Sequence, residues 1–428
     1  MKTYHNPGRE LWAEITARPE VDTAALQATV AEVIAAVRER GDAAVREYGL
    51  KFDKADLDSL EVSPGEMEAA MKAIPADLAA AIRAAHANIA AFHKAQTFAG
   101  VEVETAPGVE CWQRSVPIGS VGLYVPGGTA PLFSTVLMLA TPAKIAGCRE
   151  IVVCTPPGKD GSVNPAILAA AAIAGVDRIY KVGGVQAVAA MAYGTETIPK
   201  VSKIFGPGNS YVMAAKQAVG AAAVAVDMPA GPSEVCVIAD GKADPAFVAA
   251  DLLSQAEHGP DSQVLLVSTS AELVSRVEAE IGRQMATLPR REVAERAMAN
   301  SVAVVLGSTA EAMELSNAYA PEHLIIATED CDSLAGGVVN AGSVFIGKWA
   351  CESAGDYASG TNHTLPTHGY ATAYSGVNLD SFCRKITFQK LSERGVASIG
   401  RTVETMARHE MLDAHANAMA VRIERAGA

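Results

Sequence analysis

The sequence predicts an α/β fold with two similar units, a helical region before them and a helical tail after them. From Val116 to Ile346, short β-branched runs alternate with Ala-rich helical runs, and glycine or proline separates one run from the next. This alternation is typical of βαβ units around a parallel sheet. The length of 428 residues also exceeds one ordinary core, which favours two or three domains.

The chain before this alternation is predicted to be helical. Apolar residues recur at helical spacing between Leu26 and Val37, and a long Ala-rich stretch runs from Met67 to Phe92. His86 and His93 are seven residues apart, and we interpret them as polar cover on one helix face. Residues 1–8 have a charged, turn-like character without an apolar run, so they do not resemble a secretory signal.

The first α/β unit extends from about Val121 to Gly231. In chain order, strands and helices alternate over residues 120–125, 135–146, 150–154, 165–174, 178–182, 187–193, 203–205 and 211–219. The turn Gly206-Pro207-Gly208-Asn209 then joins a strand to a helix, where backbone N–H groups can face an anion. Because no Gly-x-Gly-x-x-Gly or Walker motif is present, a phosphate site and an ordinary turn both remain open.

The second unit begins after Ser233 and has a similar plan. Strands and helices alternate over residues 235–238, 245–257, 264–268, 271–285, 301–306 and 310–318, before two last strands at 324–327 and 343–346. Beyond Leu379 the pattern is helical, with Val396, Ile399 and Val403 on one face, and no further strand is expected. We expect this tail to pack on a partner subunit.

Composition excludes several classes of protein. The formal charge of -13, without a cluster of Lys and Arg, argues against a surface for nucleic acid or an anionic membrane. No window reaches 18 apolar residues, so a membrane span is not expected. The seven cysteines form no Cys-x-x-Cys pair, which favours reduced thiols in a cytoplasmic protein and excludes a thiolate zinc finger.

One short segment, Tyr319 to Leu324, sets a carboxylate beside an imidazole. Glu322 and His323 follow Pro321 at a predicted junction between a loop and a strand. Their ordinary pKa values, about 4.3 and 6.5, differ enough for two proton transfers of different demand. The alternative interpretation is a solvated charge next to a satisfied polar neighbour, because a lone Glu-His pair is a weak signal.

A second group of residues suggests a metal site. Six of the nine histidines follow position 257, and Gln255 and His258 are three residues apart at a helix end, hence on one face. Asp356 lies in Ala354 to Gly360, which we expect to be a loop because its residues are small. One carboxylate with two or more imidazoles suits zinc. Spacing alone favours Glu257 over Gln255 as a ligand, since carboxamides are uncommon around zinc.

Several long motifs resemble the histidinol dehydrogenase family. They occupy residues 123–128, 204–209, 227–234, 254–263, 319–324 and 355–363 in the family's order. The resemblance extends from about Leu26 to Arg422, nearly the whole chain. It implies a zinc-dependent homodimer that oxidises L-histidinol to L-histidine through L-histidinal, with two NAD+ per turnover.

The resemblance also implies an organisation into two similar incomplete Rossmann-like (aldehyde-dehydrogenase-like) domains. Residues 1–21 would form an N-terminal arm. Residues 22–120 and 234–378 would form a discontinuous first α/β domain that carries the bases and most zinc ligands. Residues 121–233 would form the second domain, on the nucleotide side, and residues 379–428 a helical tail that contacts the partner subunit.

Family motifs assign roles to individual residues. The implied zinc ligands are Gln255, His258, Asp356 and His415. The implied substrate contacts are Ser233, Gln255, His258, His323, Asp356, His363, Glu410 and His415, and the implied nucleotide contacts are Tyr124, Gln186 and Asn209. His415 belongs to a tail motif that in the family reaches into the neighbouring subunit. His323 would accept the alcohol proton, Glu322 would activate water for the aldehyde step, and zinc would orient the substrate.

Three alternatives differ from this interpretation. Relatives in the same superfamily act on sulfonated diols, but the matches at Glu410 and His415 belong to imidazole-substrate and metal binding and argue against that substrate. A zinc hydrolase would also use a metal and a Glu-His pair, yet it would leave the turn at 206–209 and the double α/β plan unexplained. A non-catalytic binding module explains still less.

Overall fold

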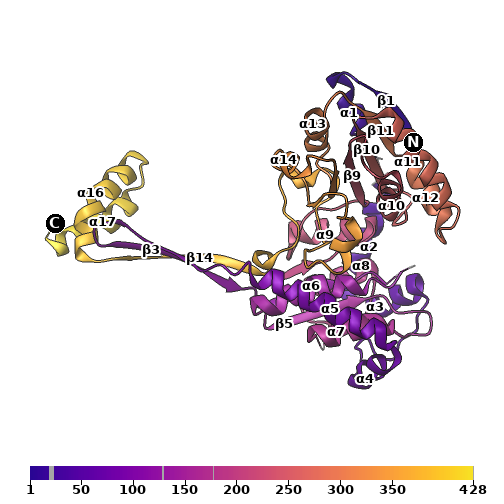
Figure 1. The fold of residues 1–428 in the computed structure, drawn as a ribbon. Helices are drawn as coiled ribbons and strands as arrows, with labels where there is room; N and C mark the ends of the chain where they lie inside the picture. The colour runs from indigo at the N-terminus through magenta and orange to yellow at the C-terminus, as the bar shows by residue number, and fades with distance from the viewer. Residues whose placement is uncertain (19–23, 128–129, 177, 428) are drawn as a thin grey trace.

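The computed structural model describes residues 1–18, 24–127, 130–176 and 178–427. Figure 1 shows two lobes, one above the other, and an arm that projects from them and ends in two helices. Each lobe is built around one parallel sheet, and the arm contains a third, antiparallel sheet.

The first lobe contains a six-stranded parallel sheet in the order β1-β11-β10-β9-β12-β13. The strands are β1 (Lys2–His5), β9 (Glu234–Ala239), β10 (Gln263–Ser268), β11 (Val302–Val305), β12 (His323–Ala327) and β13 (Ser343–Ile346). One face packs against α10 (Pro245–Ala256), α11 (Ala271–Met285) and α12 (Arg291–Ala299). The other face packs against α1 (Trp12–Ile15), α13 (Thr309–Tyr319) and α14 (Cys331–Ala335). Along β9, Val235 and Val237 enter one core while Cys236 and Ile238 enter the other, as strand geometry requires.

The second lobe contains a five-stranded parallel sheet in the order β6-β5-β4-β7-β8. The strands are β4 (Ser120–Tyr124), β5 (Glu150–Thr155), β6 (Arg178–Lys181), β7 (Lys203–Phe205) and β8 (Ala225–Val226). One face carries α4 (Pro64–Ala73), α5 (Ala76–Lys94), α6 (Phe133–Ala146) and α7 (Pro165–Ala174). The other face carries α2 (Ala24–Arg40), α3 (Asp42–Tyr48), α8 (Gly184–Tyr193) and α9 (Ser210–Ala222).

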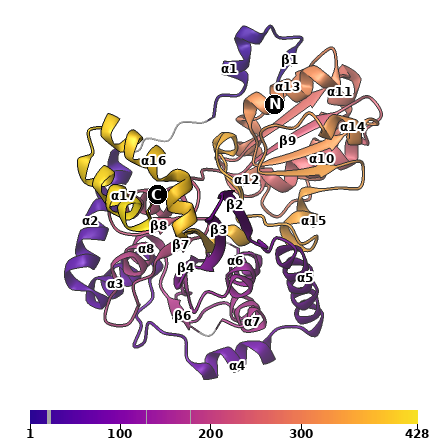
Figure 2. The same cartoon turned by 90° about the vertical axis from the view of Figure 1, so that its left-hand side faces the viewer.

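This packing corrects the predicted placement of residues 22–120 in the same domain as 234–378. Val30 and Val33 of α2 share a core with the five-stranded sheet, and so do Ile82 and Ile89 of α5 on its opposite face. In both views α4 lies at the end of this lobe farthest from the six-stranded sheet (Figures 1 and 2). A parallel sheet must be covered on both faces, and these helices supply that cover next to α6 to α9.

The two sheets have the same topology. If their strands are numbered by chain order within each sheet, leaving β1 aside, both follow the order 3-2-1-4-5. β1 joins the edge of the six-stranded sheet by pairing with β11, so the expected turn-like start is wrong for Lys2 to His5. All four residues of β1 carry polar groups and are at most half-buried, so no apolar pattern marks this edge strand in the sequence.

The arm contradicts the expectation that no strand follows residue 379. β14 (Cys383–Leu391) pairs antiparallel with β3 (Val109–Pro117), which also pairs with β2 (Val101–Ala106). Phe388 stacks on Trp112 with ring centroids 5.3 Å apart. The polar composition of β14 does not predict a strand. Its strand conformation depends on pairing with β3, a segment almost 300 residues earlier in the chain.

The arm ends in α16 (Glu393–His409) and α17 (Asp413–Ala426), which pack on each other at its tip. Figure 2 views the arm roughly end on, with these helices towards the viewer. The remaining short elements are η1 (Arg9–Leu11), η2 (Gly49–Asp53), α15 (Glu352–Tyr357), η3 (Tyr370–Thr372) and η4 (Leu379–Phe382).

The segment between β13 and the arm connects the two lobes. Asn88 donates from its side chain to the Ala358 carbonyl (2.8 Å), and Asn362 donates to the Met138 carbonyl (2.7 Å). His93 is fully buried, and its Nε2 lies 3.4 Å from Asn362 Nδ2. Its interpretation as a polar residue on the helix surface is therefore wrong. The segment that carries Asp356 and His363 is therefore bound to α5 and α6 of the other lobe through Ala358 and Asn362.

Candidate active site

The Glu322-His323 pair lies at the amino end of β12, directly after the end of α13. Ala320 ends that helix in the left-handed conformation (φ 50°), which is uncommon for a residue with a Cβ atom and is typical of tightly constrained turns. Glu322 and His323 are both buried. The turn therefore holds two ionisable side chains inside the protein and not in solvent.

One residue, Glu234, holds both side chains through its backbone. Its N–H donates to Glu322 Oε2 (2.9 Å), and its carbonyl lies 3.2 Å from His323 Nδ1. A carbonyl only accepts, so this bond requires the proton on Nδ1 and leaves Nε2 as a free acceptor. His323 Nε2 is buried, has no hydrogen-bond partner among the described residues, and lies 3.7 Å from Asp356 Oδ1.

Burial shifts the two pKa values in opposite directions. Burial, together with the nearby His258 and His363, lowers the pKa of His323 to about 3, so the imidazole is neutral at physiological pH. Burial raises the pKa of Glu322 well above its usual range, with further contributions from Glu234 and Asp356. A neutral imidazole with a free Nε2 can accept a proton, although its lowered pKa makes it a weaker base than an ordinary imidazole. The raised pKa of Glu322 makes its ionised carboxylate a stronger base than an ordinary one.

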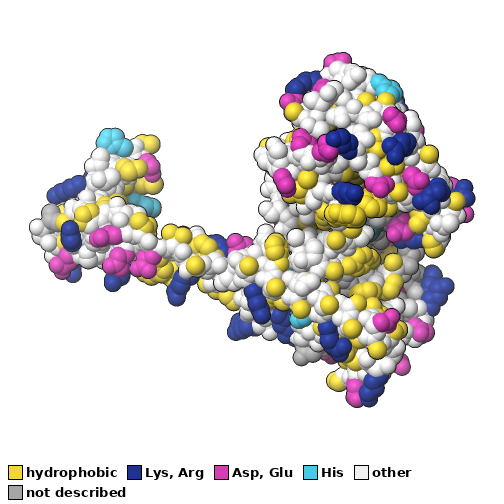
Figure 3. Space-filling model, viewed as in Figure 1, with side chains coloured by type: hydrophobic (Ala, Val, Ile, Leu, Met, Phe, Trp, Pro, Cys, Tyr) yellow, Lys and Arg dark blue, Asp and Glu magenta, His cyan; other side chains and the backbone are white. Residues whose placement is uncertain are grey.

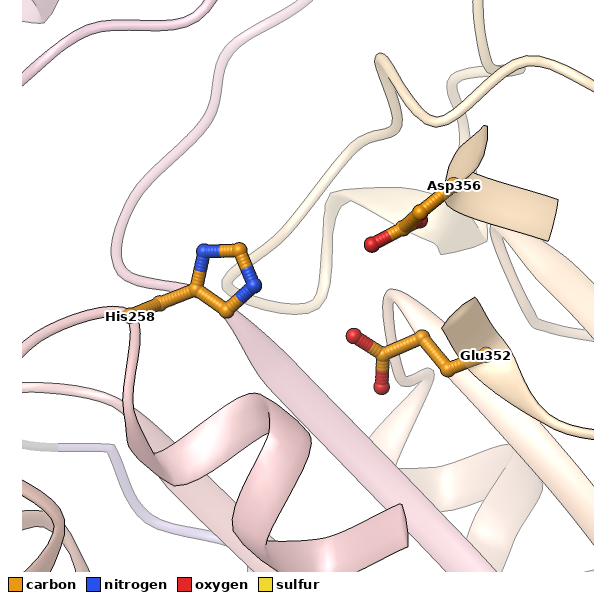
Figure 4. A group of neighbouring side chains, drawn as sticks. All are labelled: His258, Glu352 and Asp356. Atoms are coloured by element: carbon orange, nitrogen blue, oxygen red, sulfur yellow. The ribbon is translucent and has the colours of Figure 1, made fainter. Parts of the chain in front are cut away.

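Beside this pair, three side chains form a candidate metal site. Ligand atoms of His258, Glu352 and Asp356 all lie within 4.8 Å of one another (Figure 4). His258 follows the end of α10 and keeps an exposed edge, while Glu352 and Asp356 lie one turn apart on α15. Burial raises the pKa of Asp356 to about 7 and that of Glu352 well above its usual range. Two carboxylates this close, Glu352 buried and Asp356 mostly so, favour a cation between them.

The predicted loop around Asp356 is wrong, because residues 352–357 form the helix α15. The small residues have a packing reason: a Cβ atom on Gly355 would lie 2.6 Å from the Phe345 ring. Sequence reasoning also missed Glu352, although its spacing of four residues from Asp356 was a usable signal.

Gln255 lies next to this group and is fully buried. With its amide nitrogen turned towards Glu352, it donates to Oε2 of that residue (2.7 Å) and accepts from the Glu234 N–H (2.9 Å). Glu257, which spacing alone favoured, ends α10 and is not in the group of three. Gln255 therefore links the carboxylate group to the residue that holds both bases.

His363 and Ser233 also lie close to the bases. Burial lowers the pKa of His363 to about 4, with a further contribution from His258. In the part of the chain that the structure describes, its buried Nε2 has no hydrogen-bond partner. Ser233 immediately precedes Glu234 at the start of β9. His323 and His363 therefore place two ring nitrogens without described partners near the candidate metal site. A bound ligand that donates hydrogen bonds to these nitrogens would satisfy them.

Glu410 and His415 are not brought to this site by their own chain. Both are exposed, and they lie at α16 and α17, at the tip of the arm and away from the lobes (Figure 1). The site residues contributed by one chain are therefore Gln255, His258, Glu322, His323, Glu352, Asp356 and His363.

The predicted nucleotide residues gather at the carboxyl ends of strands in the other sheet. Tyr124 ends β4, and its hydroxyl accepts from the Gly184 N–H (3.1 Å) at the start of α8. Asn209 caps α9 by accepting from the Val212 N–H (3.1 Å). Strands β4 and β7 are neighbours at the point where strand order reverses, which is where open α/β sheets bind ligands.

The turn at Gly206 is shaped by a close approach of two backbones. Gly206 has a φ of 127°, and a Cβ atom there would lie 2.1 Å from the Tyr124 carbonyl oxygen. Its N–H donates to Asp227 (2.7 Å), its carbonyl accepts from Lys216 (2.7 Å), and Lys216 and Asp227 form a buried ion pair. This network fixes the turn that presents Asn209.

Asp53 is a polar residue of this region that sequence reasoning missed. Gln186 is almost fully buried. Its Nε2 lies 3.5 Å from Asp53 Oδ2, while its Oε1 has no hydrogen-bond partner within the described ranges. Burial raises the pKa of Asp53 to about 6. No sequence motif marks Asp53, because it reaches Gln186 only through the packing of α3 and η2 near α8.

The donor set of the first lobe fits zinc. One imidazole and two carboxylates converge, with no thiolate among them, and a catalytic zinc ion is commonly held by three such ligands. Three ligands leave the fourth position of a tetrahedral zinc ion open, and Gln255, the substrate or another subunit would fill it.

The fold and the site define a two-lobed α/β enzyme with a pair of buried bases beside residues able to hold a metal. The chain belongs to the histidinol dehydrogenase family, whose model matches residues 16–423. As a member of this family, it is an oxidoreductase of histidine biosynthesis that oxidises histidinol.

Individual relatives match over almost their whole length. A histidinol dehydrogenase of Bacteroides fragilis (strain YCH46) is 61% identical over 424 residues, covering 99% of both chains. One of Shigella dysenteriae serotype 1 is 50% identical over 413 residues, covering 96% of this chain and 94% of the relative. The crystal structure of histidinol dehydrogenase from Elizabethkingia anophelis has a TM-score of 0.98 and 50% identity, covering 100% of this chain and 99% of that chain.

No described helix combines the length and the apolar character that crossing a membrane requires.

Proposed function

We propose that the chain converts L-histidinol to L-histidine through L-histidinal in a four-electron oxidation, with NAD+ as the oxidant and zinc as the resident metal. The observation that carries this proposal is the arrangement around Glu234. One backbone residue holds two buried bases with opposite pKa shifts, and the free nitrogen of one of them faces a candidate metal ligand.

The reaction needs two bases because its two oxidations differ. In the first, His323 Nε2 accepts the proton of the substrate hydroxyl as hydride leaves the carbon. In the second, water must add to the aldehyde before another hydride can leave the same carbon. Glu322 accepts a proton from that water, and the product is a carboxylate. NAD+ would accept each hydride, so one substrate consumes two molecules of the oxidant.

The metal site is proposed to consist of Gln255, His258, Asp356 and His415 from the partner subunit's tail, with Glu352 beside them. Zinc bound here would supply orientation by holding the imidazole and amine of the substrate. Ser233, His363 and Glu410 would complete the substrate contacts. His363 Nε2, buried and unpartnered, supports this assignment.

The nucleotide is proposed to bind in the other lobe, at Tyr124, Gln186 and Asn209. The reversal of strand order beside β4 and the fixed turn at Gly206 support this location. The shared 3-2-1-4-5 order also supports the interpretation of both lobes as incomplete Rossmann-like units, similar to those of aldehyde dehydrogenases.

We further propose that the enzyme is a homodimer with sites shared between subunits. Met406 and Met411 on the arm's tip are 60% and 87% exposed, and Leu412 is 43% exposed. Figure 3 shows hydrophobic side chains along the arm and its terminal helices. An arm of this kind, with exposed apolar residues and two predicted site residues, fits insertion into a second copy. The seven unpaired cysteines favour a cytoplasmic location.

The test is to add L-histidinol and NAD+ to the zinc-loaded protein and follow NADH by absorbance. The proposal predicts two NADH per histidinol consumed. One NADH per substrate, with histidinal accumulating, would contradict the four-electron reaction.

A further inference from the structure

Arg18 connects the N-terminal segment to the residues around the two bases. Its Nε lies 2.5 Å from Glu234 Oε1 and its Nη2 lies 2.9 Å from Glu234 Oε2, a bidentate pair whose side chains are 12% and 3% exposed. Nη2 also donates to the Tyr319 carbonyl (2.6 Å), and the guanidinium lies over the Tyr319 ring, 4.2 Å from its centroid. Arg18 therefore binds two residues that are 85 positions apart in the chain.

Both partners of Arg18 adjoin the bases. Tyr319 is the last residue of α13, and the left-handed residue Ala320 follows it on the way to Glu322. Glu234 supplies the N–H that holds Glu322 and the carbonyl that holds His323. A single guanidinium thus fixes the turn from one side and the backbone that supports both bases from the other.

Further contacts tie the same segment to this region. Gln263 donates to the Ala17 carbonyl (3.0 Å) and accepts from the Tyr319 hydroxyl (3.0 Å). Glu234 Oε1 also accepts from the His368 N–H (2.9 Å), on the segment that follows His363. The Glu234 carboxylate is therefore the point where three parts of the chain meet.

Charge makes this arrangement sensitive to the loss of Arg18. The buried Glu234 carboxylate lies close enough to Glu322 to raise its pKa, so without a counterion it would be an unpaired buried charge beside a second carboxyl group. The carboxylate would have to turn towards another partner, and that change would move the backbone that holds Glu322 and His323. Lysine would keep the charge but could not reproduce the bidentate and ring contacts.

We propose that Arg18 is a positioning residue for the oxidation: it holds Glu234 and the Tyr319 carbonyl, and thereby sets the geometry of Glu322 and His323. The inference rests on the proposed roles of these two bases. Among the described residues, the hydrogen bonds and the ring contact of Arg18 join it to Glu234 and Tyr319 and not to the proposed metal or nucleotide residues. Its loss should therefore change the chemical step more than the binding of either substrate.

The test compares Arg18→Met and Arg18→Lys with wild type in the zinc-loaded enzyme. Misplacing a base by about 1 Å can cost about 100-fold, so we expect kcat for histidinol to fall about 10- to 100-fold in Arg18→Met. The KM value for NAD+ should change by less than about 3-fold. The KM value for histidinol and the zinc content should change less than kcat does, because in the described part of the chain Glu234 contacts Gln255 only through its backbone N–H. Arg18→Lys should recover part of the lost kcat. Arg9→Met is the matched control. Arg9 lies on the same N-terminal segment as Arg18 and also forms an ion pair, with Glu314, but that pair is exposed.

A second variant keeps the test decisive if Arg18→Met does not fold. Glu234→Gln removes the same ion pair with little change of shape, and the two substitutions should be strongly non-additive if they disrupt one contact. A kcat within 2-fold of wild type in folded Arg18→Met, or in Glu234→Gln if the first does not fold, overturns the proposal. The wild-type enzyme is assayed first. If it yields no NADH from histidinol, that result refutes the proposed function and not the role of Arg18.

Discussion

His323 Nε2 lies 3.7 Å from Asp356 Oδ1, although the two residues belong to different elements, the strand β12 and the helix α15. The acceptor nitrogen of a proposed base therefore opens towards a proposed metal ligand. A substrate held by the metal would lie within reach of the base, and binding and proton transfer would share one small volume.

Replacing His323 by Asn should reduce histidinol oxidation by about 100- to 10,000-fold, the range typical of a lost general base. Asn keeps a donor for the Glu234 carbonyl but provides no basic nitrogen at the position of Nε2. Steady-state kinetics with histidinol measure the effect. Near-normal turnover in a folded variant would remove His323 from the role of base.

Replacing Glu352 by Gln should weaken zinc retention by about 10- to 100-fold, the usual effect of losing a carboxylate at or beside a metal ligand. The reason is that Glu352 accepts from Gln255 and converges with His258 and Asp356 in the candidate metal site. Metal content after dialysis against graded chelator gives the measurement, with Glu257→Gln as the neighbouring control. Equal zinc retention in both variants would exclude Glu352 from the metal site.

Replacing His415 by Asn should lower zinc retention, although α17, the helix that carries it, lies far from the lobes of its own chain in Figure 1. Mixing this variant with Glu322→Gln, followed by subunit exchange, should restore some activity if the tail completes the partner's site. In such a heterodimer one of the two sites carries neither substitution. A mixture no more active than its components would argue against shared sites.

The stability of the protein should depend on pH through Asp53. Burial raises its pKa from 3.8 to about 6, so between about pH 4 and pH 6 the folded state binds more protons than the unfolded state. This contribution to stability is present below about pH 4 and is lost as the pH rises through 6. Asp53→Asn should therefore raise the melting temperature at pH 7 relative to wild type, and much less at pH 4. Asp56→Asn, at an exposed neighbour, is the control. A difference that is constant across this range would contradict the assignment.

Sequence reasoning worked best where strands are covered on both faces. Strands such as β4 and β9 are continuous apolar runs because helices pack on each side, so their pattern alone predicts them. The arm strands β3 and β14 are largely polar and at most partly buried over most of their length. They depend on pairing with each other and, for β3, with β2, so neither strand gives a clear sequence signal. The helices at 24–94 were predicted, but the sheet that they cover depends on three-dimensional packing.

The candidate site shows the same division. Glu322, His323, His258 and Asp356 lie in motifs, and the structure brings them together. Glu352 and Arg18 lie outside those motifs, and their importance appears only when α15 and the N-terminal segment pack beside Glu234. A single charged residue in a sequence carries little information until its partners are known.

The division of labour between the two bases is the central claim, and Glu322→Gln tests it most directly. The variant keeps an acceptor for the Glu234 N–H but cannot take a proton from water. Its oxidation of histidinal, supplied as substrate and followed by NADH absorbance, should fall far more than its first oxidation of histidinol measured in a single turnover. Histidinal oxidation at the wild-type rate would contradict the role of Glu322 and the account built on it.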